Sequence, residues 1–125
     1  MTTFHCDLNM ARTWHILRED GVLTLCRQAP ARLDVSAATV LPAGDPVRLA
    51  HQIRQDMWRA VRNVRGFSPV VRLEQRDGGI AVTAGGQVMG PVAPGLPARI
   101  AAVLENPANR RRWLAHAGRG RAQWS

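Results

Sequence analysis

The chain has 125 residues, of which 46% are hydrophobic, and this combination predicts a single globular domain with its own core. Its 17 basic residues are all arginine and outnumber 9 acidic residues, so the formal net charge of +8 favours an acidic partner such as nucleic acid or an acidic protein. The sequence has neither a run approaching the ~20 apolar residues of a membrane span nor an N-terminal signal peptide, so we expect a cytoplasmic protein of a bacterium or bacteriophage.

The first third of the chain predicts β-structure. Apolar residues alternate with polar ones in several short runs, which is typical of strands with one buried face. Glu19-Asp20-Gly21 predicts a hairpin turn, because glycine supplies a positive φ there. We expect Leu23 and Leu25 to share one face of the strand that follows. The expected strands are residues 4–10, 13–18 and 22–27, which form a meander, and 32–37 at an edge of the sheet.

The clearest element is a long central helix from Asp45 to Gly66. Asp45 is a good N-cap, and Pro46 suits the first helical position because no backbone N–H is needed there. Gly66 stands where a left-handed C-terminal cap is expected. Between these ends, apolar residues recur at spacings of three and four and predict one buried stripe: Leu49, Ile53, Met57, Ala60, Val61 and Val64.

The opposite face of this helix is rich in arginine. With about 100° between successive residues, Arg54 and Arg65 form one row that includes or borders Trp58, and the other arginines form a second row. Such a face can track phosphates, with Trp58 free to stack on a base. Alternatively, it is a solvated surface on which Trp58 folds under a neighbouring loop. The candidate residues are Arg48, Arg54, Trp58, Arg59, Arg62 and Arg65.

The rest of the chain predicts a second meander and a helical C-terminus. Strands are expected at 70–76 and 80–84, with Asp77-Gly78-Gly79 between them, and Gly85-Gly86 is expected to turn the chain again into 87–90. A short helix is expected at 96–105. Asn106-Pro107 then interrupts it, and 109–117 predicts one or two further helical turns.

A second basic cluster follows near the C-terminus. Arginines interleaved with tryptophans are the composition that single-stranded nucleic-acid binding requires, namely charge for the phosphates and flat rings for the bases. The structural alternative is that Trp113 anchors the last helix while the arginines face water. We expect residues 119–125 to be a flexible tail beside a domain at 1–118. The candidates here are Arg110, Arg111, Arg112, Arg119, Arg121 and Trp124.

The residues that most often carry catalysis are not grouped in this sequence. The carboxylates are scattered and several stand at turns or caps, so no pair invites general acid–base chemistry. His5, Cys6, His15 and Cys26 fall in one predicted meander, yet their spacing is unlike the paired ligands of structural zinc sites, so we treat the cysteines as packing residues. We therefore expect no catalytic residue, no metal and no cofactor.

These observations predict an α+β fold in which antiparallel β-meanders are covered by the long central helix and a C-terminal helix. We expect a small binding protein rather than an enzyme, and nucleic acid is the partner that the arginine-rich helix faces favour. The alternative is a protein-interaction or assembly module, such as an accessory subunit or inhibitor that docks an acidic protein. A homodimer through the edge strand at 32–37 is a third interpretation.

Overall fold

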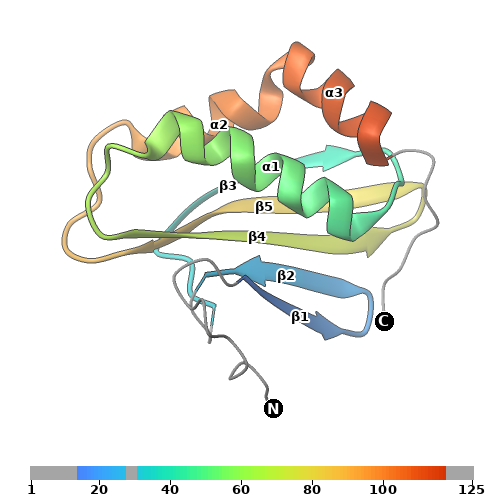
Figure 1. Cartoon of the computed structure of the whole chain (residues 1–125), viewed down its shortest axis with the longest axis horizontal. Coiled ribbons are helices and arrows are strands. Elements are labelled where there is room, and N and C mark those ends of the chain that lie inside the picture. Colours follow the sequence, from blue (N-terminus) through green and yellow to red (C-terminus); the bar gives the residue numbers. More distant parts are fainter. Residues whose placement is uncertain (1–13, 28–30, 118–125) are drawn as a thin grey trace.

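The computed structural model describes residues 14–27 and 31–117, which form an antiparallel sheet and a set of helices on one of its faces (Figure 1). The predicted α+β class, with helices packed on an antiparallel sheet, is confirmed. The elements are β1 (His15–Glu19), β2 (Val22–Cys26), β3 (Val35–Leu41), α1 (Pro46–Val61), β4 (Phe67–Arg76), β5 (Gly79–Val88), α2 (Leu96–Glu105) and α3 (Pro107–Ala117).

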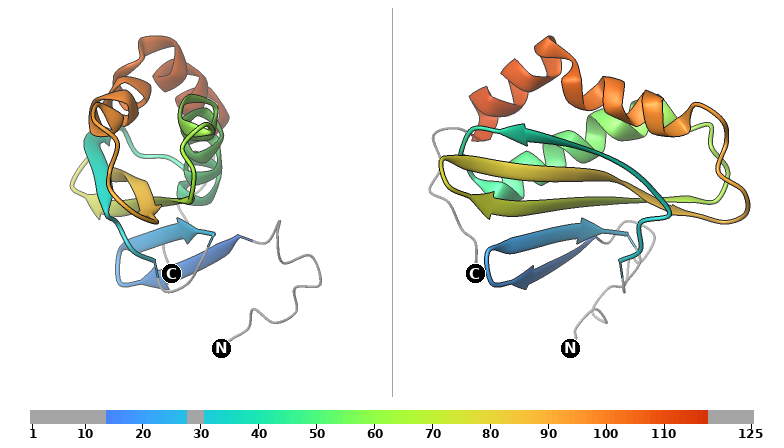
Figure 2. Two further views of the ribbon diagram at one scale, coloured as in Figure 1. Left: turned by 90° about the vertical axis from the view of Figure 1, so that its left-hand side faces the viewer. Right: turned by 180° about the vertical axis from the view of Figure 1, so that it is seen from behind.

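The sheet consists of two hairpins joined edge to edge, with a further strand added. β1 pairs with β2 and β4 pairs with β5, and the hairpins join where β2 pairs with β4. β3 pairs with β5, which gives the order β1-β2-β4-β5-β3. β3 and β4 therefore run in the same direction with β5 between them, and α1 connects them across the covered face (Figure 2). β3 is an edge strand, as predicted, but it begins at Val35 instead of residue 32.

Helix α1 begins as its sequence predicts. The carboxylate of Asp45 accepts a hydrogen bond from the backbone N–H of Val47 at 3.2 Å, and Pro46 is the first helical residue. The buried face carries the predicted stripe, of which Leu49, Ile53 and Met57 are fully buried. This face packs on β2 and β4, so the stripe positions the helix over the centre of the sheet.

The same helix ends earlier than predicted. Its last residue is Val61, and residues 62–66 form a turn in which the N–H of Val64 donates to the carbonyl of Val61. Gly66 has the expected positive φ of +69°, but it serves the entry into β4 instead of capping the helix. A Cβ atom at Gly66 would lie 2.9 Å from the Cβ of Met89, so the chain reversal also requires glycine sterically.

Gly85 and Gly86 lie inside β5, so the prediction that they form a turn is wrong. Both glycines occupy ladder positions, where Gly85 is paired with Ser36 and Val70 and Gly86 with Val35 and Pro69. A Cβ at Gly85 would lie 1.9 Å from the carbonyl oxygen of Val35, and one at Gly86 would lie 2.2 Å from that of Ser68. Glycine is therefore required here by the close approach of the neighbouring strands. In the sequence, a glycine needed for this reason looks the same as a glycine needed for a turn.

The core lies between the covered face of the sheet and the helices. Leu23 and Leu25 lie on the same face of β2, as predicted, and both are fully buried in this core. Asn106-Pro107 separates α2 from α3. The side chain of Asn106 accepts a hydrogen bond from the backbone N–H of Asn109 at 3.0 Å and so caps the start of α3. Trp113 of α3 is fully buried against this core.

Some predictions concern residues outside the described ranges. These are the strand expected at 4–10, with His5 and Cys6, and the tail expected at 119–125. Within residues 14–27 and 31–117, no helix has both the length and the apolar character needed to cross a bilayer.

Candidate functional site

The described arginines divide into two groups by their partners. One group lies within 4.0 Å of a carboxylate and consists of Arg32, Arg48, Arg59, Arg76, Arg110 and Arg112. The others have no carboxylate within that distance in the part of the chain that the structure describes: Arg18, Arg27, Arg54, Arg62, Arg65, Arg72, Arg99 and Arg111. Because a guanidinium without a counter-charge keeps its donors for a ligand, the second group supplies the better candidates.

The predicted C-terminal cluster is largely built into the fold. One terminal nitrogen of Arg110 donates to the hydroxyl of Thr39 and to the carbonyl of Leu104, both at 3.0 Å, and the other donates to the carbonyl of Val40 at 2.8 Å. Arg110 thus ties α3 to the end of α2 and to the edge strand β3. Its donors are used within the molecule, which leaves few for a phosphate.

Asp56 of α1 holds the neighbouring residues of this cluster. Its carboxylate accepts hydrogen bonds from the indole N–H of Trp113 at 2.6 Å and from the guanidinium of Arg112. Trp113 is fully buried, as the structural interpretation of this segment predicts. Arg111 remains exposed. The other candidates here, Arg119, Arg121 and Trp124, lie outside the described residues.

The predicted arginine face of α1 also divides. Arg48 lies 3.5 Å from its own N-cap Asp45, and Arg59 lies 3.4 Å from Asp56, so both have partners on the helix. Arg54 and Trp58 lie one turn apart, on a side of α1 different from that of Arg48 and Arg59. Arg62 follows Trp58 by one more turn, since its backbone is still helical at φ −62° and ψ −17°. This row of unpaired arginines and tryptophan is the part of the predicted face that remains available.

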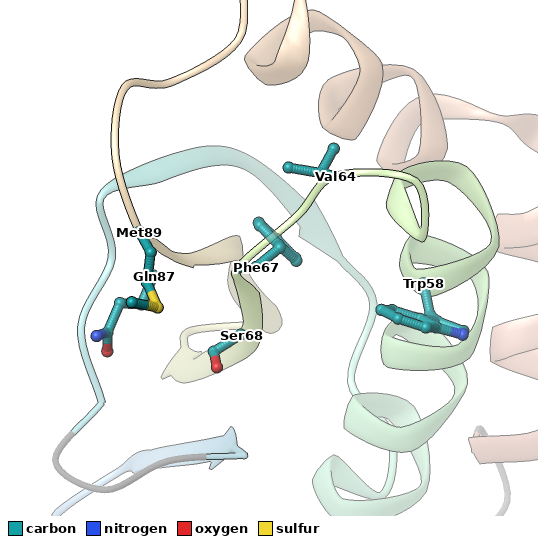
Figure 3. A pocket seen from close by; sticks show the side chains of 7 residues that line it. Trp58, Val64, Phe67, Ser68, Gln87 and Met89 are labelled. Carbon is teal, nitrogen blue, oxygen red and sulfur yellow. The ribbon is translucent and has the colours of Figure 1, made fainter.

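A shallow pocket of about 280 Å³ opens beside this row where α1 ends. Figure 3 shows the side chains that line it: Trp58 from α1, Val64 from the following turn, and residues from β4 and the end of β5. Trp58 is 44% exposed and Met89 is 78% exposed. A second hollow shares Val64 and Met89 and is lined by Arg65 and Arg99. Apolar and aromatic surface is thus bordered by unpaired arginines.

A second tryptophan continues this surface on the other side of Arg54. Trp14 precedes β1 and Arg27 follows β2, so the ladder that pairs His15 with Cys26 brings them opposite each other. The guanidinium carbon of Arg54 lies 4.6 Å from the centroid of a Trp14 ring, and that of Arg27 lies 5.2 Å from it. Both distances are within cation–π range. Two arginines from separate elements therefore stack on one tryptophan.

The electrostatics of this cluster are unbalanced. Partial burial and the nearby charge of Arg27 lower the pKa of Arg54. Partial burial and the charge of Arg54 likewise lower the pKa of His51, which lies one turn earlier on α1. Among the described residues, the Nε of Arg54 is buried without a hydrogen-bond partner. The cluster concentrates positive charge, and the described part of the chain places no carboxylate within 4.0 Å of Arg27 or Arg54 to offset it.

We call these residues together the arginine–tryptophan face. Sequence reasoning identified its α1 half but missed Trp14 and Arg27. A signal for the missing half exists in the sequence, because a hairpin closed at Asp20-Gly21 places residue 14 opposite residue 27. The members of the face are Trp14, Arg27, Arg54, Trp58, Arg62 and Arg65.

The described residues do not gather a metal site or a nucleophile. They contain no group of three or more histidine, cysteine or acidic side chains placed to hold a metal ion. His15 and Cys26 pair across β1 and β2, but Cys26 is fully buried and its burial raises the pKa of the thiol, which disfavours the reactive thiolate. Asp34 is also structural, since it accepts hydrogen bonds from Arg32 and from the backbone N–H of Val88.

Comparison of the chain with protein-family models, with curated proteins and with solved structures found no match.

Proposed function

We propose that this protein binds nucleic acid through the arginine–tryptophan face. The observation that carries the proposal is that Arg27, Arg54 and Arg62 have no carboxylate partner among the described residues and lie beside Trp14 or Trp58. Arg65, which also lacks a partner there, lines the adjoining hollow. Arginines supply bidentate donors for phosphate oxygens, and tryptophan supplies a flat surface for a base. The net charge of +8 favours approach to a polyanion.

The form of the face favours a single strand over a duplex. Trp58 is partly exposed at the rim of the shallow pocket, where an unpaired base has access to its ring. The bases of a duplex are stacked on each other and present only their edges, so they offer no free face to the ring of Trp58. The charged row along α1 then follows the backbone that leads away from that base.

A protein partner is the second candidate function, and exposed apolar side chains favour it. Met89 and Val92 are exposed close to the same end of α1, at 78% and 40%. An acidic protein with an apolar centre would cover these side chains and pair with Arg65 and Arg99 around them. Such an interface is less sensitive to salt than a phosphate-tracking surface.

Salt dependence tests the proposal. Binding of fluorescent single-stranded oligonucleotides is measured by anisotropy over a range of salt concentrations. With three to four phosphates neutralised, we expect the logarithm of affinity to fall against the logarithm of salt with a slope of about −2 to −3, at ~0.7 per phosphate on a single strand. Replacing Arg54, Arg62 and Arg65 together with glutamine should remove most of the binding and leave the domain folded.

A matched variant separates the face from the overall charge. Arg18, Arg72 and Arg111 are exposed arginines that have no carboxylate partner within residues 14–27 and 31–117, so replacing all three with glutamine removes the same charge away from Trp58. This control should keep most of the affinity. Equal losses in the two variants would contradict the proposal. A protein partner that co-purifies after nuclease treatment, without any oligonucleotide binding, would favour the second candidate.

A further inference from the structure

The contact of two arginines with one tryptophan has a definite geometry. Trp14 lies just before β1, Arg27 lies just after β2, and Arg54 is in the middle of α1. The hairpin register and the packing of α1 on β2 fix all three positions. A guanidinium stacked on a ring loses conformational freedom but keeps the in-plane donors at its edge. Trp14 therefore holds two arginine forks in place before any ligand arrives.

The charge of Arg54 is only partly compensated in this arrangement. The two guanidinium groups repel each other, and Arg54 is half-buried without a carboxylate within 4.0 Å among the described residues. Its Nε donates to no acceptor there. A partly desolvated charge is normally compensated by a counter-charge or by hydrogen bonds. Because the described part of the fold supplies neither to Arg54, a ligand is the natural source of both.

Phosphate is the group that suits these donors. A guanidinium fork matches the spacing of two phosphate oxygens, and two forks supported by the same ring offer enough donors for a group with more than two oxygens and a full negative charge. The cluster also lies one helical turn from Trp58, so a strand with its phosphate here could reach that ring with a neighbouring base. We propose that Arg27 and Arg54, held against Trp14, form a binding site for one phosphate group.

The site itself does not depend on the proposed function, although that function supplies the source of the phosphate. The group is either the backbone phosphodiester of a bound single strand or a free or terminal phosphate. These sources share one chemistry and differ in what else they contact. An oligonucleotide engages Trp58 and Arg62 as well, whereas inorganic phosphate is too small to do so.

The test is a phosphate titration of the full chain followed by NMR of the arginine Nε–H and tryptophan indole signals. Inorganic phosphate is added at constant ionic strength against chloride. The signals of Trp14 and Arg54 should shift saturably with phosphate and not with chloride. Arg27→Gln and Arg54→Lys should each weaken binding by about tenfold, the latter because lysine keeps the charge but lacks the fork.

Trp14→Leu tests the same site without changing any charge. It should weaken phosphate binding by a similar factor, because the two guanidinium groups lose the ring that orients them. Arg72→Gln is the control, since Arg72 lies on the face of β4 opposite the buried Leu73 and should bind phosphate normally. Circular dichroism confirms that each variant is folded.

The outcomes separate this inference from the proposed function. Saturable phosphate binding that depends on Trp14 and Arg27 supports the site even if no oligonucleotide binds. Competition between phosphate and an oligonucleotide assigns the source to the nucleic-acid backbone, and a requirement for a 5′-phosphate assigns it to a terminal group. The inference is overturned if phosphate produces no saturable shift. It is also overturned if the Arg27, Arg54 and Trp14 variants bind like Arg72→Gln, even where oligonucleotide binding by the rest of the face survives.

Discussion

Asp56→Ala should weaken the packing of helix α3 on the domain. Asp56 is nearly buried, with its side chain 9% exposed, and it accepts hydrogen bonds from Trp113 and Arg112, both more than fifty positions away in the chain. Without the carboxylate, the buried indole N–H of Trp113 has no acceptor, which costs about 1–3 kcal/mol. Arg112 is 40% exposed and regains water, so its lost pair adds about 0–1 kcal/mol.

We therefore expect Asp56→Ala to lower the free energy of unfolding by about 1–4 kcal/mol. Asp56→Asn should cost about 1 kcal/mol, because one oxygen remains for the indole while the charge opposite Arg112 is lost. The measurement is urea denaturation followed by far-UV circular dichroism, with hydrogen exchange to show whether the amides of α3 lose protection before those of the sheet.

Two controls make this test specific. Asp77→Asn changes an exposed turn carboxylate and should shift stability by no more than about 0.5 kcal/mol. In a Trp113→Phe background, position 113 has no indole N–H to donate to Asp56. Asp56→Ala should then cost about 1 kcal/mol or less. If Asp56→Ala and Asp56→Asn destabilise equally, or if the cost is the same in both backgrounds, the hydrogen bond to Trp113 is not what holds α3.

Two further predictions concern the sheet and the charged cluster. Gly85→Ala should destabilise the domain by about 3 kcal/mol or more and weaken the pairing of β3 with β5, because the added Cβ would meet the carbonyl oxygen of Val35. The control is Gly78→Asn, at an open turn position with φ +77°, which should change the urea midpoint little. Because His51 has a pKa below its ordinary 6.5, its contribution to stability is fully present above pH 6.5 and is lost as pH falls through the lowered value. His51→Gln should therefore be less sensitive than the wild type to acidification in this window, and an unchanged pH profile of denaturation would contradict this.

Much of the fold could be predicted because its signals are local. The start of α1 depends on Asp45 and Pro46, and its orientation depends on a stripe within one helix, so both follow from adjacent residues. The hairpin at Asp20-Gly21 is equally local. Gly85 and Gly86 were misjudged because a glycine demanded by a neighbouring strand and one demanded by a turn are identical in sequence. Only the strand partners distinguish these two cases.

The candidate site could be predicted only in part, for the same reason. Arg54 and Trp58 are one turn apart on a single helix, so their proximity follows from helical geometry. The meeting of Trp14 and Arg27 with Arg54 requires a hairpin register and the docking of α1 above it. The role of Asp56 depends on Trp113, which is 57 positions away. No local pattern connects those residues.

The two arginine clusters show why composition alone does not locate a binding surface. In sequence they are equivalent, since each sets several arginines beside a tryptophan. In the structure, Arg110 and Arg112 face carbonyl and carboxylate oxygens of their own fold, whereas Arg54 of the α1 cluster lies over the ring of Trp14, which it shares with Arg27. A guanidinium with internal acceptors stabilises the domain, and one without them remains available to an external anion. The distribution of acceptors, more than that of arginines, therefore determines where this protein can bind a phosphate.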